Sequence, residues 1–199
     1  MKETGYSLRG LAAALLALAL GADAVRAGDV PFMESFDNLS SGALISLNEW
    51  ETLRNQDVQV QTTVKFAGAK AAIVGTNAVM WNEFNDATIT NVWIDFYARQ
   101  PYSTNNTPPV ITGSVAAAFY IDTAGALRVL SNDTWLTLST TVPSNTWQRF
   151  TVKLDYKASR WSLFTADDVP NRLLTSVITN VPFASISTNS YFQAFRVKN

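Results

Sequence analysis

Four side chains of the types that bind sugars occupy every second position of one segment: Trp93, Asp95, Tyr97 and Arg99. Aromatic rings stack on the faces of pyranose rings, and carboxylate and guanidinium groups hydrogen-bond to sugar hydroxyls. In an extended strand alternate side chains point to the same face, so these four would share one surface. The spacing therefore predicts a binding surface for a glycan or a peptide. The alternative is that this face belongs to the core, or that Trp93 and Tyr97 pack under a loop.

The residue types that are missing restrict the chemistry further. The chain contains no histidine and no cysteine, which excludes a Ser–His–Asp triad, a thiol nucleophile and His- or Cys-ligated zinc. A glycosidase would need two carboxylates facing each other, roughly 5–9.5 Å apart. The nearest pairs by spacing are Glu49 with Glu51 and Glu83 with Asp86, and the second pair lies in a predicted loop. We therefore expect no catalytic residues, and a carboxylate-dependent glycoside hydrolase is the weakest alternative.

The segment from Asn145 to Phe164 indicates how such a surface would be positioned. Phe150, Val152 and Leu154 alternate with polar residues, which is typical of a strand with one face on a core and one in water. Residues 157–160 contain no large apolar side chain and predict a turn, after which Trp161 begins a second apolar strand. The pattern predicts a β-hairpin.

This hairpin resembles the Trp–strand–Asp–turn–strand hairpin of laminin-G-like, concanavalin-A-type jelly rolls. The matching residues are Trp147, the strand ending at Asp155, then Trp161 and Phe164. The resemblance implies an all-β, two-sheet antiparallel jelly-roll sandwich. Jelly-roll glucanases carry their carboxylates on one strand as Glu-x-Asp-x-Glu, and this sequence has no such triplet. The resemblance therefore favours a lectin-like role over a glucanase-like one.

Many laminin-G-like domains also hold a structural calcium ion on loop carboxylates. Calcium takes six to eight oxygen ligands. By residue type the candidates are Glu34, Asp37, Asp122 and Asp155. No segment has the dense Asp and Asn spacing of a dedicated calcium loop, so the sequence predicts no required cofactor and leaves a structural calcium open.

The remaining strands are predicted from alternation, or from short apolar runs between turn signals. They cover residues 31–37, 48–53, 58–64, 71–75, 78–82, 90–99, 115–122, 126–130, 135–138, 171–178 and 191–197. Val64 is placed on the apolar face of its strand with Val58 and Val60. No sustained helical period occurs, which favours a sandwich of antiparallel strands.

Residues 1–27 have the pattern of a Sec-type signal peptide. Lys2 and Arg9 precede an apolar run over residues 11–20, and small residues occupy the positions that precede a predicted cleavage after Ala27. The run is short for a bilayer span, which takes roughly 20 residues, although a retained N-terminal anchor is the alternative. We therefore expect residues 28–199 to form one domain. Export from a bacterial cell, to the cell surface, the medium or the periplasm, is the simplest interpretation.

Charge narrows the expected partners. Charged residues make up 16% of the chain and the formal net charge is −1, so neither nucleic acid nor an anionic membrane is expected as a partner. The predicted partner is a carbohydrate or a cell-surface polymer. The alternative is a structural protein that assembles with itself into a surface layer, sheath or fibre by strand addition, with residues 28–31 as a linking arm.

Overall fold

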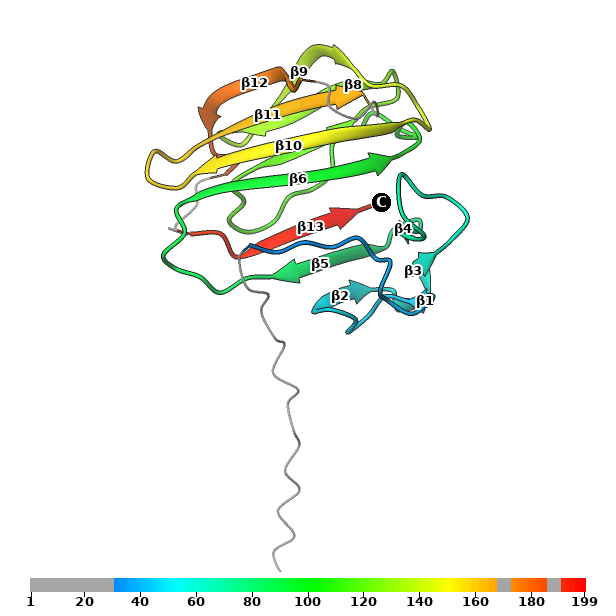
Figure 1. Ribbon diagram of the computed structural model, residues 1–199. Helices are drawn as coiled ribbons and strands as arrows, with labels where there is room; N and C mark the ends of the chain where they lie inside the picture. Colours follow the sequence, from blue (N-terminus) through cyan, green and yellow to red (C-terminus); the bar gives the residue numbers. More distant parts are fainter. Residues whose placement is uncertain (1–30, 168–172, 186–190) are drawn as a thin grey trace, which may run out of the picture.

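The computed structural model describes residues 31–167, 173–185 and 191–199 (Figure 1). The predicted signal peptide, residues 1–27, lies outside the described residues. Within these ranges the only helix is one 3-10 turn, η1 (Asn55–Asp57), and no helix is long and apolar enough to cross a membrane. All remaining elements are strands, so the all-β fold class is confirmed.

The described strands form four antiparallel sheets. The large sheet has the order β12 (Thr175–Pro182), β11 (Arg160–Asp167), β10 (Trp147–Asp155), β6 (Asn91–Arg99). The β5 sheet has the order β13 (Ala194–Lys198), β5 (Val79–Glu83), β2 (Trp50–Leu53). The β8 sheet has the order β7 (Ala118–Ile121), β8 (Ala126–Ser131), β9 (Thr134–Thr141). The β3 sheet has the order β1 (Gly42–Ala43), β3 (Val58–Gln61), β4 (Ala71–Val74).

These sheets pack as a sandwich around two neighbouring cores. The large sheet and the β5 sheet lie side by side in Figure 1, with β13 next to β6, and the ring centroids of Phe96 and Phe195 are 5.2 Å apart. The core of the large sheet meets β8, where Leu127 and Val129 are fully buried. A second core gathers around Trp50. Pairing among the described residues gives four sheets, so the two-sheet jelly-roll order stays a prediction.

The predicted hairpin is confirmed as β10 and β11. Leu154 lies opposite Trp161, and Val152 lies opposite Leu163. These four side chains are at most 5% exposed. Burial of one such side chain contributes about 1.5–3 kcal/mol, which explains why this register is well specified. The intervening positions of both strands are thereby turned to the outer face of the large sheet.

Residues 31–37, predicted as the first strand, form no strand. Phe36 adopts a left-handed backbone conformation with φ of 64°, and its N–H donates to Glu34 Oε1 at 2.6 Å. This local turn interrupts the extended backbone. The two phenylalanines of the segment pack against Trp50 instead, with ring centroids 6.1 Å away for Phe32 and 5.8 Å away for Phe36.

The predicted position of Val64 in the core is corrected in the following segment. Strand β3 ends at Gln61, whose side-chain oxygen accepts the N–H groups of Thr63 at 2.6 Å and Val64 at 2.8 Å. This turn leaves Val64 37% exposed and outside the core. Strands β4 and β5 exist as predicted, and they pair in different sheets, so the turn between them connects the β3 sheet to the β5 sheet.

Candidate functional site

The residues predicted to bind a ligand lie on the outer face of the large sheet. Strands β6 and β10 pair in continuous register, with Trp93 opposite Lys153, Asp95 opposite Thr151, Tyr97 opposite Arg149 and Arg99 opposite Trp147. The alternate positions of β6, Val92, Ile94, Phe96 and Ala98, belong to the core. The structure thus brings all four predicted residues to one face, as the alternation requires.

Asp95 is engaged by its own sheet. Arg149 donates from Nε to Oδ1 at 2.9 Å and from Nη2 to Oδ2 at 2.8 Å, and the Thr151 hydroxyl donates to Oδ1 at 2.6 Å. Burial alone would raise the pKa of Asp95, but the hydrogen bonds from Arg149 and Thr151 and the charge of Arg149 together hold it below its ordinary value. Asp95 therefore stays ionised and ties β6 to β10.

The far end of the predicted surface is covered by a loop. The Phe66 ring, from the loop between β3 and β4, stacks on Tyr97 with centroids 3.9 Å apart and planes 14° apart. The Phe66 ring also meets the Trp147 ring edge-on, with centroids 5.9 Å apart. Arg99 is also occupied, since its Nε donates to the Asn145 carbonyl oxygen at 2.7 Å. The alternative that an aromatic residue packs under a loop is therefore correct for Tyr97.

Trp93 remains open. Its side chain is 58% exposed, far more than expected for a core tryptophan. The ring of Phe164, from β11, stacks beside it with centroids 6.0 Å apart and planes 30° apart. The Lys153 ammonium lies 5.3 Å from the centroid of the Trp93 ring, within cation–π range. Both neighbours restrain the indole but leave much of its surface exposed to solvent.

A depression of about 290 Å³ opens beside this indole. We use the name Trp93 surface for six of the residues that line this depression: Trp93, Lys153, Asp155, Arg160, Phe164 and Asn180. They come from β6, β10, β11 and β12. Among these residues, sequence reasoning predicted Trp93 as a ligand contact but not Arg160, Phe164 and Asn180, whose position depends on strand pairing. Arg196 lies elsewhere, in β13, 5.5 Å from the ring of Trp81.

Two of the carboxylates considered for calcium stabilise the N-terminal part of the chain. Glu34 Oε2 accepts Asn48 Nδ2 at 2.8 Å and Trp50 Nε1 at 3.3 Å. Asp37 Oδ1 accepts the N–H groups of Ala69 and Lys70, each at 2.8 Å. Asp37 thereby anchors the loop that carries Phe66.

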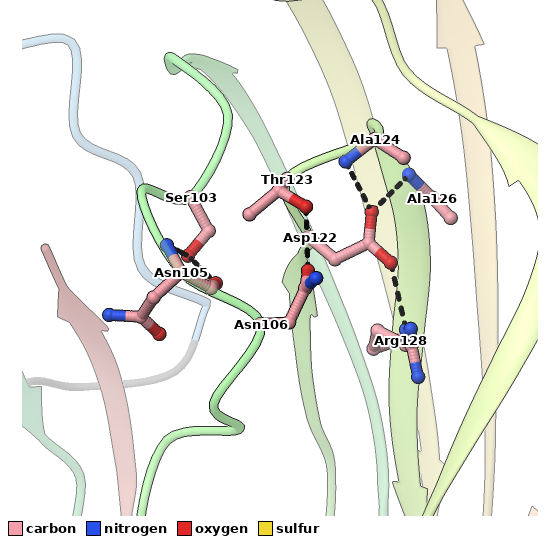
Figure 2. A network of polar contacts seen from close by, with 8 residues as sticks. All are labelled: Ser103, Asn105, Asn106, Asp122, Thr123, Ala124, Ala126 and Arg128. Atoms are coloured by element: carbon pink, nitrogen blue, oxygen red, sulfur yellow. Dashed lines mark hydrogen bonds and ion pairs between the residues drawn. The ribbon is translucent and has the colours of Figure 1, made fainter.

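The other two carboxylates occupy hairpin turns. Asp122 Oδ1 accepts the N–H groups of Ala124 and Ala126, and Oδ2 accepts Arg128 Nε, all at 2.9 Å (Figure 2). Burial alone would raise the pKa of Asp122, but these donors hold it below its ordinary value. Asp155 Oδ1 accepts Ala158 N at 2.9 Å. Over the described ranges no group of three or more acidic side chains gathers, so a calcium ion at any of the four candidates stays a prediction.

The carboxylates considered for catalysis lie away from the Trp93 surface. Glu83 is the last residue of β5 and not part of a loop, and its Oε1 accepts Trp81 Nε1 at 3.3 Å. Asp86 Oδ1 accepts the N–H of Thr88 at 2.9 Å and its hydroxyl at 2.6 Å, which closes a local turn and lowers the pKa of Asp86. Glu51 lies opposite Trp81 in the β5 sheet.

No protein-family model matches the sequence, and no curated protein matches it. Among solved structures the chain is similar to the catalytic domain of a glycoside hydrolase family 131 protein from Coprinopsis cinerea. The sequence identity is 17% and the TM-score is 0.28, and the match covers 75% of this chain and 62% of the other. Similarity at this level carries no functional inference.

Proposed function

We propose that this protein is an exported, non-catalytic domain that binds a carbohydrate or a cell-surface polymer at the Trp93 surface. The observation that carries the proposal is the exposed indole of Trp93, stacked beside Phe164 and bordered by polar side chains. A flat, held aromatic ring offers a sugar a stacking face at little cost in side-chain entropy.

The polar groups beside Trp93 suit the hydroxyls of a bound sugar. Asn180 and Ser162 line the depression, together with the charged side chains of Lys153, Asp155 and Arg160. The depression, at about 290 Å³, lies at the lower end of ligand-site volumes, which are about 300–1,000 Å³. A site of this size and openness suits a short stretch of a polymer chain better than an enclosed small molecule.

The test is binding of soluble oligosaccharides, screened on a glycan array and then measured by calorimetry. Trp93→Ala removes the stacking face and is expected to weaken binding by about tenfold or more. The matched control is Trp81→Ala, which removes a second tryptophan lying beside a cation on the neighbouring β5 sheet. Equal binding by wild type and Trp93→Ala would overturn the proposal. Release of reducing sugar by the wild-type protein would overturn its non-catalytic part.

A second candidate function, self-assembly, is favoured by strand β9. This strand ends the β8 sheet, its eight residues include no charge, no proline and no glycine, and no described strand pairs with its outer edge. Natural edge strands are usually protected by such residues. Trp135 of β9 also lines a depression of about 280 Å³ with Val110, which is 82% exposed.

Light scattering over a range of protein concentrations tests self-assembly. Pairing of β9 with the same strand of a second copy predicts a mass that grows with concentration. Thr137→Lys places a charge on the exposed edge and is expected to keep the protein monomeric. A wild-type mass that stays monomeric at every concentration would exclude this candidate while leaving the carbohydrate proposal intact.

A further inference from the structure

We infer that the ligand of the Trp93 surface is an anionic glycan, one that carries carboxylate or sulfate groups; this inference rests on the proposed function above. Two cations, Lys153 and Arg160, and one carboxylate, Asp155, line the depression. The chain as a whole carries a formal net charge of −1. The region beside the exposed indole is therefore positively charged, whereas the chain as a whole is not.

Two other cations of the outer face, Arg149 and Arg99, have contacts elsewhere in the protein. Arg149 is held by both oxygens of Asp95, and Arg99 donates to the carbonyl oxygen of Asn145. Neither Arg149 nor Arg99 lines the depression. The charge available to a ligand must therefore come from the depression itself.

Neither cation of the depression, Lys153 or Arg160, has a carboxylate partner among the described residues. Within the part of the chain that the structure describes, the ion pairs join Arg54 to Asp57, Arg128 to Asp122 and Arg149 to Asp95. The Lys153 ammonium lies over the Trp93 ring. Arg160 donates from one nitrogen, Nη1, to the Asn180 carbonyl oxygen at 3.3 Å. Its other guanidinium nitrogen atoms carry N–H groups that can donate to a ligand.

Asp155 cancels only part of this charge. It lies opposite Arg160 in the β10–β11 register, but its Oδ1 accepts the Ala158 N–H of the turn, and no ion pair joins Asp155 to Arg160. Two cations against one carboxylate leave the depression with one net positive charge. A ligand with an anionic group would meet this charge directly.

The geometry combines the two contacts that an acidic sugar needs. A sugar ring stacked on Trp93 lies next to Lys153, since the ammonium is already 5.3 Å from the indole centroid. Arginine binds carboxylate and sulfate through paired N–H groups. A ring carboxylate or a sulfate ester would therefore reach a cation while the ring keeps its aromatic contact.

Single-stranded nucleic acid also combines aromatic stacking with cations. Its affinity depends on neutralising several phosphates along a basic groove. Lys153 and Arg160 are the two cations in the depression, and Asp155 stands beside them. An acidic glycan, which needs one or two charge contacts, fits this arrangement better.

The experiment compares uronate oligosaccharides with their methyl esters, which keep the ring and the linkage and remove the charge. The probes are oligogalacturonate, oligoguluronate and oligoglucuronate, each with its ester, together with neutral gluco-oligosaccharides, a sulfated oligosaccharide and oligouridylate. We expect the preferred acid or sulfated sugar to bind about tenfold more tightly than its uncharged form at low salt. Higher ionic strength should reduce this preference.

Lys153→Met and Arg160→Gln are each expected to weaken binding of the acid more than binding of its ester, so that most of the acid-over-ester affinity ratio is lost. Arg196→Gln is the matched control, because Arg196 also lies beside a tryptophan but on the β5 sheet. Equal binding of acid and ester overturns this inference and leaves the proposed function standing. Binding of no oligosaccharide at all, charged or neutral, overturns the proposed function itself. Oligouridylate binding as tight as the best sugar overturns the glycan assignment.

Discussion

Arg149 and Asp95 form a two-point ion pair across β10 and β6, with Nε–Oδ1 at 2.9 Å and Nη2–Oδ2 at 2.8 Å. Thr151 donates a third hydrogen bond to the same carboxylate. Asp95 therefore holds two strands together on the same outer face that carries Trp93. Its role is to fix the register on which the Trp93 surface depends.

This ion pair makes the stability of the protein sensitive to acid. The pKa of Asp95 is lowered in the folded state, so its stabilising effect is present above the ordinary pKa of about 3.9 and is lost as the pH falls through the lower folded-state value. Because the Asp95 side chain is 41% exposed, we expect Asp95→Asn to cost about 1 kcal/mol at neutral pH. Urea unfolding at neutral and acid pH measures this difference.

Arg149→Lys is the control for geometry, since it keeps the charge and loses the planar, two-point contact. It should fall between wild type and Asp95→Asn at neutral pH. A difference between wild type and Asp95→Asn that persists unchanged in strong acid would show that the ion pair is not its source.

The parts of the fold that could be predicted are those in which one strand face is buried. Alternation from Phe150 to Leu154 determines which side chains face the core, and a slip of one residue would bury the polar set. Such patterning does not report on backbone conformation. The left-handed φ of 64° at Phe36 ends the extended segment predicted over residues 31–37, and neither its composition nor its periodicity indicates this.

The candidate site could be predicted only along one strand. Trp93 and its alternate neighbours follow from periodicity, because they are local in sequence. The other residues lie on strands whose pairing is set by tertiary packing: Arg160 and Phe164 on β11, and Asn180 on β12. The contact of Phe66 with Tyr97 could not be predicted either, because a single aromatic residue in a polar loop produces no periodic pattern.

Asp37→Ala should uncover Tyr97. Asp37 accepts the N–H groups of Ala69 and Lys70, and these residues follow the Phe66 ring that stacks on Tyr97. Loss of the carboxylate is expected to cost about 1–2 kcal/mol and to speed amide hydrogen exchange in residues 62–70. Chemical nitration of Tyr97 should rise in parallel. Asp37→Asn keeps one acceptor oxygen and should show a smaller effect; unchanged exchange in Asp37→Ala would contradict the anchoring role.

Gly125→Ala should be strongly destabilising. Gly125 has φ of 82°, and an added Cβ would lie 2.7 Å from Cζ of Tyr102. The expected cost is about 2–4 kcal/mol, from left-handed backbone strain together with overpacking. Gly113→Ala is the matched control, because Gly113 has φ of 81° but nothing within 4 Å of the added atom. Equal losses in urea unfolding would show that the Tyr102 contact contributes nothing.

Tyr156 should make the protein sensitive to high pH. Burial raises the pKa of Tyr156 to about 12, and its ring packs edge-on against Phe183 at 5.2 Å. Because the folded pKa lies above the ordinary value of about 10, the stabilisation is complete below that pH and is lost as the pH rises through about 12. Tyr156→Phe should therefore unfold less readily than wild type in alkali, with the phenolate absorbance of wild type rising as it unfolds. Parallel alkaline unfolding of the two proteins would refute the assignment.

Trp93→Ala should leave stability nearly unchanged, in contrast to Phe150→Ala. Trp93 is 58% exposed and Phe150 is 1% exposed. Removal of the buried ring is expected to cost about 3–5 kcal/mol, whereas removal of the exposed one should cost about 1 kcal/mol or less, chiefly its contacts with Phe164 and Lys153. Urea unfolding of both variants measures this. If Trp93→Ala were as destabilised as Phe150→Ala, the indole would belong to the structural frame of the sheet, and loss of ligand binding in that variant would no longer identify a binding surface.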